Sequence, residues 1–112
     1  MAYSKYHALK TTIDGIVFDS RLEAKRYREL KLLQTAGTIK DLKLQVPFDL
    51  VPKHTIEGIT LRATKYIADF TYIENGVYIV EDTKGFKTAE YKKKKKQLFQ
   101  RYGIEIHEVT KC

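Results

Sequence analysis

The stretch Tyr66-Ile-Ala-Asp-Phe-Thr-Tyr-Ile-Glu-Asn-Gly-Val-Tyr-Ile-Val-Glu-Asp-Thr-Lys84 decides the fold of this chain. Its Asn75-Gly76 step favours a two-residue type I′ turn, because both residues accept the positive φ that this turn requires. The β-branched and aromatic residues on either side are typical of strands. The stretch therefore predicts an antiparallel hairpin with a return strand over residues 77–83.

The tight turn also predicts which residues face one another. Counting outward from it places Asp69 directly opposite Asp82. Since side chains alternate with period two, Lys84 projects from the same face as Asp82, and Glu81 projects from the other face. A slip of one residue would reverse this assignment.

Two carboxylates that face each other across a ladder repel, and burying them unpaired among apolar residues is costly. A divalent cation would remove the repulsion between Asp69 and Asp82. Mg²⁺ needs only one or two carboxylates besides waters and a substrate phosphate. Lys84 could then position an attacking water and stabilise charge on the phosphate. The alternative is a solvated Asp69 and an ordinary surface ion pair between Asp82 and Lys84.

Glu23 is a fourth candidate. Ser20-Arg-Leu-Glu23 matches a capping box and predicts a helix that begins after Ser20 and ends near Gly37. Capping alone is a sufficient reason for a glutamate at this position. The helical wheel also puts Glu23 at the margin of the apolar stripe, from which it could reach a neighbouring sheet, although Arg26 falls on the same stripe.

The remaining patterns predict further strands and one more helix. Apolar residues alternate over residues 42–50, which indicates a half-buried strand with one apolar face, and Pro47 indicates an edge or a bulge. The members of that face are Leu42, Leu44, Val46, Phe48 and Leu50. The other predicted segments are a short strand or turn over 13–18, a loop over 51–58, a long strand over 59–73, a helix over 88–102 and a strand over 104–109. Gly85 is expected to end the return strand. The order is helix, three strands, helix, strand.

Composition limits the class of protein. A chain of 112 residues with 43% hydrophobic residues is expected to form a single domain over residues 1–112, with the polar and basic residues 1–12 as a mobile arm or edge segment. The formal net charge of +7 favours polyanionic partners. Cys112 is the single cysteine, so neither an intrachain disulfide nor a thiolate zinc site is expected. No apolar run has the length of a membrane span, and no signal-peptide pattern is present, so a cytoplasmic location is expected.

The run from Lys92 to Lys96 spans more than one helical turn and therefore points to all sides of its helix. One interpretation is a solvated helix face. Lys95, however, shares the stripe of Tyr91 and Leu98, so part of the run, with Lys87, is expected to border a cleft and contact phosphates. Tyr91 is expected in the core or near the site, and the histidines receive no role.

Asp69 followed by Asp82-Thr-Lys84 across a hairpin resembles the signature of the PD-(D/E)XK nuclease superfamily, which includes Holliday junction resolvases and RecB-like nucleases. The predicted element order resembles the αβββαβ core of that superfamily. Longer segments are similar to a small phage-encoded family that is resolvase-like or RecB-like. These segments are Phe18-Asp-Ser-Arg-Leu-Glu-Ala24, Gln45-Val-Pro-Phe48, Tyr66-Ile-Ala-Asp-Phe-Thr-Tyr72 and Val80-Glu-Asp-Thr-Lys-Gly85. Ala68 departs from the pattern, because the superfamily name has proline there.

The resemblance implies an α/β fold with a mixed sheet and a restriction-endonuclease-like core. It implies that Glu23, Asp69 and Asp82 hold Mg²⁺, for which Mn²⁺ can substitute, with the Thr83 carbonyl as an extra ligand. Lys84 is then the catalytic lysine. The nucleic-acid-binding candidates are Ser20, Arg21, Lys87, Lys92, Lys94 and Lys95.

The function expected from these observations is a metal-dependent endonuclease that hydrolyses DNA phosphodiester bonds, with branched, Holliday junction-like DNA in phage DNA metabolism as the implied substrate. A phage protein of this kind would act in the host cytoplasm, and a homodimer would place two active sites on two strands. Two alternatives stay open: a non-catalytic basic nucleic-acid-binding protein, and an accessory subunit of a phage complex.

Overall fold

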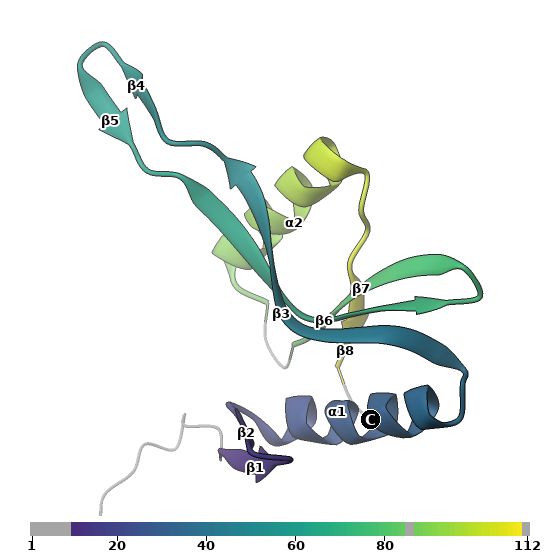
Figure 1. Ribbon diagram of the computed structural model, residues 1–112. Coiled ribbons are helices and arrows are strands. Elements are labelled where there is room, and N and C mark those ends of the chain that lie inside the picture. Colours follow the sequence, from purple (N-terminus) through teal and green to yellow (C-terminus); the bar gives the residue numbers. More distant parts are fainter. Residues whose placement is uncertain (1–9, 85–86, 111–112) are drawn as a thin grey trace, which may run out of the picture.

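The computed structural model describes residues 10–84 and 87–110 and shows a mixed α+β architecture with two helices (Figure 1). Of the arm or edge segment predicted over residues 1–12, residues 1–9 lie outside the described residues, as do Gly85 and Cys112, whereas Thr11 and Thr12 belong to a strand. The elements, in chain order, are β1 (Thr11–Ile13), β2 (Ile16–Phe18), α1 (Arg21–Thr35), β3 (Ile39–Val51), β4 (His54–Ile56), β5 (Ile59–Leu61), β6 (Thr64–Glu74), β7 (Val77–Thr83), α2 (Ala89–Tyr102) and β8 (His107–Val109).

The principal sheet has the strand order β3-β6-β7-β8, in which the first two pairings are antiparallel and β7 pairs with β8 in parallel. The predicted turn is confirmed, since Asn75 and Gly76 both have positive φ, at 52° and 77°. The ladder from Glu74–Val77 to Phe70–Glu81 keeps the predicted register. Together with α1 and α2, these strands follow the predicted order of helix, three strands, helix, strand.

Two short hairpins accompany this sheet. Residues 13–18 belong to the β1–β2 hairpin, which turns at Asp14-Gly15. The prediction of a loop over 51–58 and one strand over 59–73 was wrong. Residues 54–61 form the β4–β5 hairpin, and a break at residues 62–63 separates β5 from β6. Glu57 and Gly58 both adopt positive φ in this turn, and glutamate is an unusual residue for that conformation.

The predicted alternation of β3 is confirmed, since the even-numbered residues from Leu42 to Leu50 are half-buried or buried and the residues between them are exposed. The apolar residues nevertheless divide between two clusters, which was not predicted: Leu42 and Leu44 pack against the cluster around α1, whereas Phe48 and Leu50 belong to the cluster around α2. Between these halves Gln45 adopts a φ of 53°, which departs from extended backbone geometry. Its neighbour β6 changes in the same place, because Ala68 packs in the α2 cluster and Phe70 in the α1 cluster. Figure 1 shows β3 bending sharply at the middle of the sheet.

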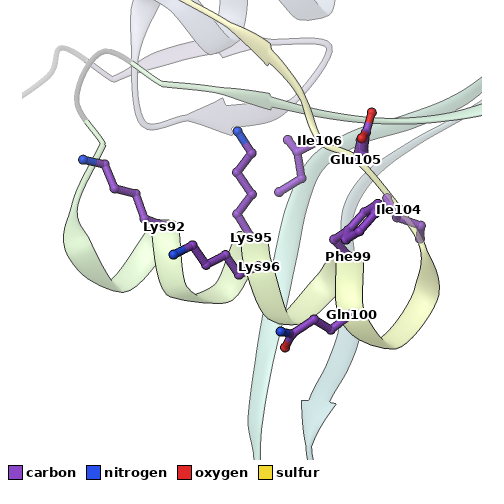
Figure 2. A pocket seen from close by; sticks show the side chains of 8 residues that line it. All are labelled: Lys92, Lys95, Lys96, Phe99, Gln100, Ile104, Glu105 and Ile106. Carbon is purple, nitrogen blue, oxygen red and sulfur yellow. The ribbon is translucent and has the colours of Figure 1, made fainter.

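The helix α2 covers the half of the bent sheet that contains Phe48 and Leu50 of β3 and Tyr66 and Ala68 of β6. Thr88 caps its N-terminus by accepting a hydrogen bond from the Tyr91 N–H (3.1 Å), and Gly103 ends it with a φ of 70°. The final strand is shorter than the predicted 104–109, because Ile104 and Ile106 pack against the α2 cluster instead of pairing with β7. A cavity of about 640 Å³ lies beside α2 and this segment (Figure 2). It is lined by Lys92, Lys95, Lys96, Phe99, Gln100, Ile104, Glu105 and Ile106.

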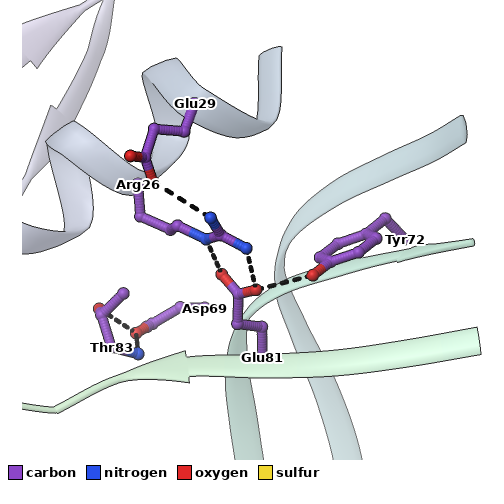
Figure 3. Close-up of polar contacts among 6 residues, drawn as sticks. All are labelled: Arg26, Glu29, Asp69, Tyr72, Glu81 and Thr83. Atoms are coloured by element: carbon purple, nitrogen blue, oxygen red, sulfur yellow. Dashed lines mark hydrogen bonds and ion pairs between the residues drawn. The ribbon is translucent and has the colours of Figure 1, made fainter. Parts of the chain in front are cut away.

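The helix α1 is fixed to the opposite face of β7 by a buried ion pair (Figure 3). Arg26 donates two hydrogen bonds to the Glu81 carboxylate, from Nε to Oε2 (2.7 Å) and from a terminal nitrogen to Oε1 (2.8 Å). The Tyr72 hydroxyl donates a third to Glu81 Oε1 (2.7 Å). Glu81 is 0% exposed, so these three donors replace the water that an ionised carboxylate needs. Neither helix of residues 10–84 and 87–110 is long and apolar enough to cross a membrane.

Replacing Arg26 with Met should lower the free energy of unfolding by about 3–5 kcal/mol, because Glu81 would remain buried without its cation. Urea denaturation at neutral pH measures this loss. Arg28→Met is the matched control, since Arg28 is exposed on the same helix and its removal should change stability by less than about 0.5 kcal/mol. Equal stability of the two variants would contradict the assignment of Arg26 as the partner that Glu81 requires.

Candidate active site

The hairpin places the Asp69 carboxylate against the return strand, beside Asp82. The described ladder ends at Phe70–Glu81, and one further step in this register puts Asp69 opposite Asp82. Asp69 Oδ2 accepts hydrogen bonds from the backbone N–H of Thr83 (2.9 Å) and from its hydroxyl (2.7 Å), as Figure 3 shows. The Asp69 side chain is therefore held in place by the residue next to Asp82.

Asp82 is the most unusual group of this region, because it is a carboxylate that is 1% exposed and only partly paired. The Tyr66 hydroxyl donates a hydrogen bond to Oδ2 (2.5 Å). Oδ1 is buried and has no hydrogen-bond partner among the described residues. Burial and the adjacent Asp69 carboxylate raise the pKa of Asp82 to about 7. Buried polar atoms are normally satisfied, so Asp82 is a candidate functional residue.

Lys84 completes the lysine-and-carboxylate arrangement predicted from the sequence. Its Nζ lies 3.6 Å from Asp82 Oδ1, which is an ion pair but too long for a good hydrogen bond. The same Nζ lies 4.7 Å from the centre of the Tyr91 ring, a cation–π distance. The ammonium is thus held between the free carboxylate oxygen and an aromatic ring from α2.

Glu23 lies in the first turn of α1, where Ser20 Oγ accepts a hydrogen bond from its backbone N–H (3.1 Å). The serine half of the predicted capping box is therefore present. The carboxylate also interacts electrostatically with the sheet. Burial, followed by the negative charges of Asp69 and Asp19, raises the pKa of Glu23 to about 7, while Lys84 opposes this rise. Glu23 also lines a cavity of about 450 Å³ together with Gln45, at the bend of β3.

Carboxylate oxygens such as those of Asp69 and Asp82 are ligands that hard divalent cations prefer. They do not form a complete set of protein ligands for a metal ion. Within residues 10–84 and 87–110, no three His, Cys, Asp or Glu side chains are close enough together to hold a metal ion. Asp82 Oδ1 is free, and Asp69 lies beside it. Mg²⁺ requires as few as one or two carboxylates and keeps several waters, so these residues fit it better than they fit a cation that needs an all-protein cage.

The predicted nucleic-acid-binding residues lie in three separate places. Lys94 lines a cavity of about 370 Å³ together with Lys84 and Lys65, next to the carboxylates. Lys92 and Lys95 line the cavity of Figure 2 on the other side of α2. Ser20 is occupied as the cap of α1, and Arg21 lines a cavity beside β1.

Lys87 and Lys95 are paired with Glu108, at 2.9 and 3.2 Å. Burial opposes ionisation of Glu108, but hydrogen bonds from Lys87, Tyr91 and Lys95 outweigh it and lower the pKa of Glu108 to about 2. These lysines are thus partly neutralised in the protein without a ligand. Lys84 and Lys94 line the cavity beside Tyr66 and are also paired with carboxylates, Lys84 with Asp82 at 3.6 Å and Lys94 with Glu90 at 3.3 Å.

Tyr66 was not among the predicted site residues. Strict alternation along β6 would put its side chain on the face opposite to Asp69, away from the site. The bend at Gln45 turns this half of the sheet so that the Tyr66 hydroxyl reaches Asp82. This bend depends on a positive φ at Gln45, and no local sequence pattern predicts such a φ at a glutamine. The sequence therefore held no signal for Tyr66.

Fold and site together define a basic α+β protein with a half-satisfied buried aspartate beside a lysine. The chain belongs to the family described as "Protein of unknown function (DUF1064)", whose model matches residues 3–112. Comparison with curated proteins and with solved structures gave no match.

The raised pKa values of Asp82 and Glu23 predict that stability in EDTA falls as pH rises from 5 to 8. Between their ordinary values of 3.8 and 4.5 and the raised values of about 7, the folded state binds more protons than the unfolded state. Stability therefore decreases with pH across this window. Thermal unfolding should show a lower Tm at pH 8, and Asp82→Asn should reduce the difference. Asp41→Asn, at an exposed position, should keep it; an unchanged difference in Asp82→Asn would refute the shift.

Proposed function

We propose that this protein is a Mg²⁺-dependent endodeoxyribonuclease with a restriction-endonuclease-like, PD-(D/E)XK-type core, in which Mn²⁺ can replace Mg²⁺. The observation that carries the proposal is the buried Oδ1 of Asp82, which lies beside Asp69, forms an ion pair with Lys84 at 3.6 Å and has no hydrogen-bond partner among the described residues. The αβββαβ order of the principal elements and the resemblance of Asp69, Asp82 and Lys84 to the nuclease signature support it.

Asp69 and Asp82 would hold the cation, and Glu23 would complete its surroundings from α1. The Thr83 carbonyl is the further candidate ligand. A bound Mg²⁺ supplies Lewis acidity at the phosphate and lowers the pKa of a bound water. Both aspartates are oriented before a cation binds, because Thr83 holds Asp69 and Tyr66 holds Asp82 through hydrogen bonds.

Lys84 acts on the phosphate itself. Its ammonium lies beside the carboxylates, where it can neutralise charge that develops on the scissile phosphate and help to position the attacking water. Lys65 and Lys94 line the adjoining cavity and would bind the neighbouring phosphates of the same strand. The net charge of +7 attracts DNA to this face and should make binding depend steeply on salt.

Asp82→Asn and Lys84→Ala should each reduce metal-dependent cleavage by at least about 100-fold, since each removes a charge that acts on the reacting phosphate. Plasmid and four-way-junction substrates, incubated with Mg²⁺, Mn²⁺ or EDTA and separated on gels, measure this. Asp41→Asn and Lys31→Ala are matched controls at exposed positions and should cleave like the wild type.

The DNA affinity of both site variants, measured in EDTA, should stay within a few-fold of wild type. Equal cleavage by site and control variants would refute the site. Binding without cleavage by pure wild type on every substrate would instead favour a non-catalytic DNA-binding protein. Faster cleavage of the four-way junction than of the plasmid would assign branched DNA as the substrate.

A further inference from the structure

The β4–β5 hairpin stands away from the rest of the molecule as a projecting arm (Figure 1). It prolongs β3 and β6, and β6 runs directly from it to Asp69. We use "the arm" for residues 52–63. The arm is joined through the break at residues 62–63 to the strand that carries Asp69.

One face of the arm is apolar and has no partner among the described residues. Ile56 pairs with Ile59 across the hairpin, and His54 pairs with Leu61, so these four side chains share a face. Ile56 is 55% exposed and Ile59 is 64% exposed. The opposite face carries Thr55 and Thr60, whose hydroxyls lie 3.1 Å apart in a hydrogen bond. An exposed apolar surface that is surrounded by polar groups marks an interaction site.

The charges around the arm favour a polyanion over a second copy of the chain. Lys53, Arg62 and Lys65 are exposed at its base, and Glu57 is the only acidic residue over residues 52–65. Pairing two such arms would bring like charges together, whereas a DNA duplex would neutralise them. Lys65 and Ile67 also line the cavity that contains Lys84, so the cationic surface runs from the arm to the candidate site.

The dimensions match a DNA groove. The major groove of B-DNA, about 12 Å wide, admits a two-stranded β-ribbon and offers thymine methyl groups to apolar side chains. Ten residues separate Ile59 from Asp69 along the chain, and strand geometry of about 3.3 Å per residue gives a reach of roughly 30 Å. This is about one turn of the double helix.

We propose that the arm binds the major groove of duplex DNA about one turn away from the scissile phosphate. Ile56, Ile59 and Leu61 contact base edges, and Arg62 and Lys65 contact phosphates at the rim of the groove. The proposal rests on the proposed function for the identity of its partner. It adds a second point of attachment, which the active site does not provide.

The test compares Ile56→Ser/Ile59→Ser with a matched control on the other face of the arm, Thr55→Ala/Thr60→Ala. Fluorescence anisotropy in EDTA measures the Kd for a hairpin with a stem of about 7 bp, which at about 3.4 Å per base pair is shorter than the reach of the arm, and for a duplex of about 30 bp. The wild type and the control should bind the longer duplex about tenfold more tightly than the shorter one, because only the longer duplex reaches the arm. The serine variant should bind both duplexes alike, with a circular dichroism spectrum like that of the wild type. Arg62→Ala/Lys65→Ala should reduce the slope of log K against log salt by about 2.

The failures of the two proposals are distinguishable. A serine variant that keeps the full preference for the longer duplex, in a protein that binds and cleaves DNA, would overturn the role of the arm and leave the nuclease intact. Absence of DNA binding by the wild type would overturn both. If sedimentation shows a dimeric wild type and a monomeric serine variant with unchanged DNA affinity, the arm binds a second copy, and the DNA proposal fails.

Discussion

The ion pair between Arg26 and Glu81 is the interaction on which the rest of the structure depends. An ionised carboxylate inside a sheet requires replacement of its hydration, and here an arginine from α1 and the Tyr72 hydroxyl provide it. The planar guanidinium accepts only a narrow range of positions relative to the carboxylate, which fixes both the height and the rotation of α1 on β7. Glu23, almost one helical turn earlier, is thereby held close enough to the sheet for the negative charge of Asp69 to raise its pKa.

The adjacent residues Glu81 and Asp82 on β7 are both buried carboxylates, but they differ in how fully they are hydrogen-bonded. Glu81 and Asp82 are both buried acids, but Glu81 has three donors and Asp82 has a single tyrosine hydroxyl and a distant lysine. The difference follows from the alternation of the strand, which directs one side chain to α1 and the other to the face that α2 covers. A satisfied carboxylate stabilises the fold, whereas an unsatisfied one is available for the cation that we propose.

The sequence predicted those features that local rules control. Asn75-Gly76 determined the register of β6 and β7, Ser20 marked the start of α1, and the shared face of Asp82 and Lys84 followed from the register. Features that depend on tertiary packing were missed. Alternation over Leu42 to Leu50 gave no sign of the bend at Gln45, and so neither the division of the core nor the approach of Tyr66 to Asp82 was predictable. The β4–β5 hairpin was hidden because its turn uses a glutamate where asparagine or aspartate is usual.

The outer strand β3 affects whether copies of this molecule aggregate through the edges of their sheets. It is 13 residues long and pairs, within the described part of the chain, with β6 alone, so it offers backbone groups to any foreign strand. Pro47 has no N–H to donate, Lys40 and Lys43 are exposed, and the ladder shifts register between Lys40 and Lys43 and again between Asp49 and Val51. These are the means by which natural sheets resist fibril-like stacking, and they leave an open sheet unable to template its own growth.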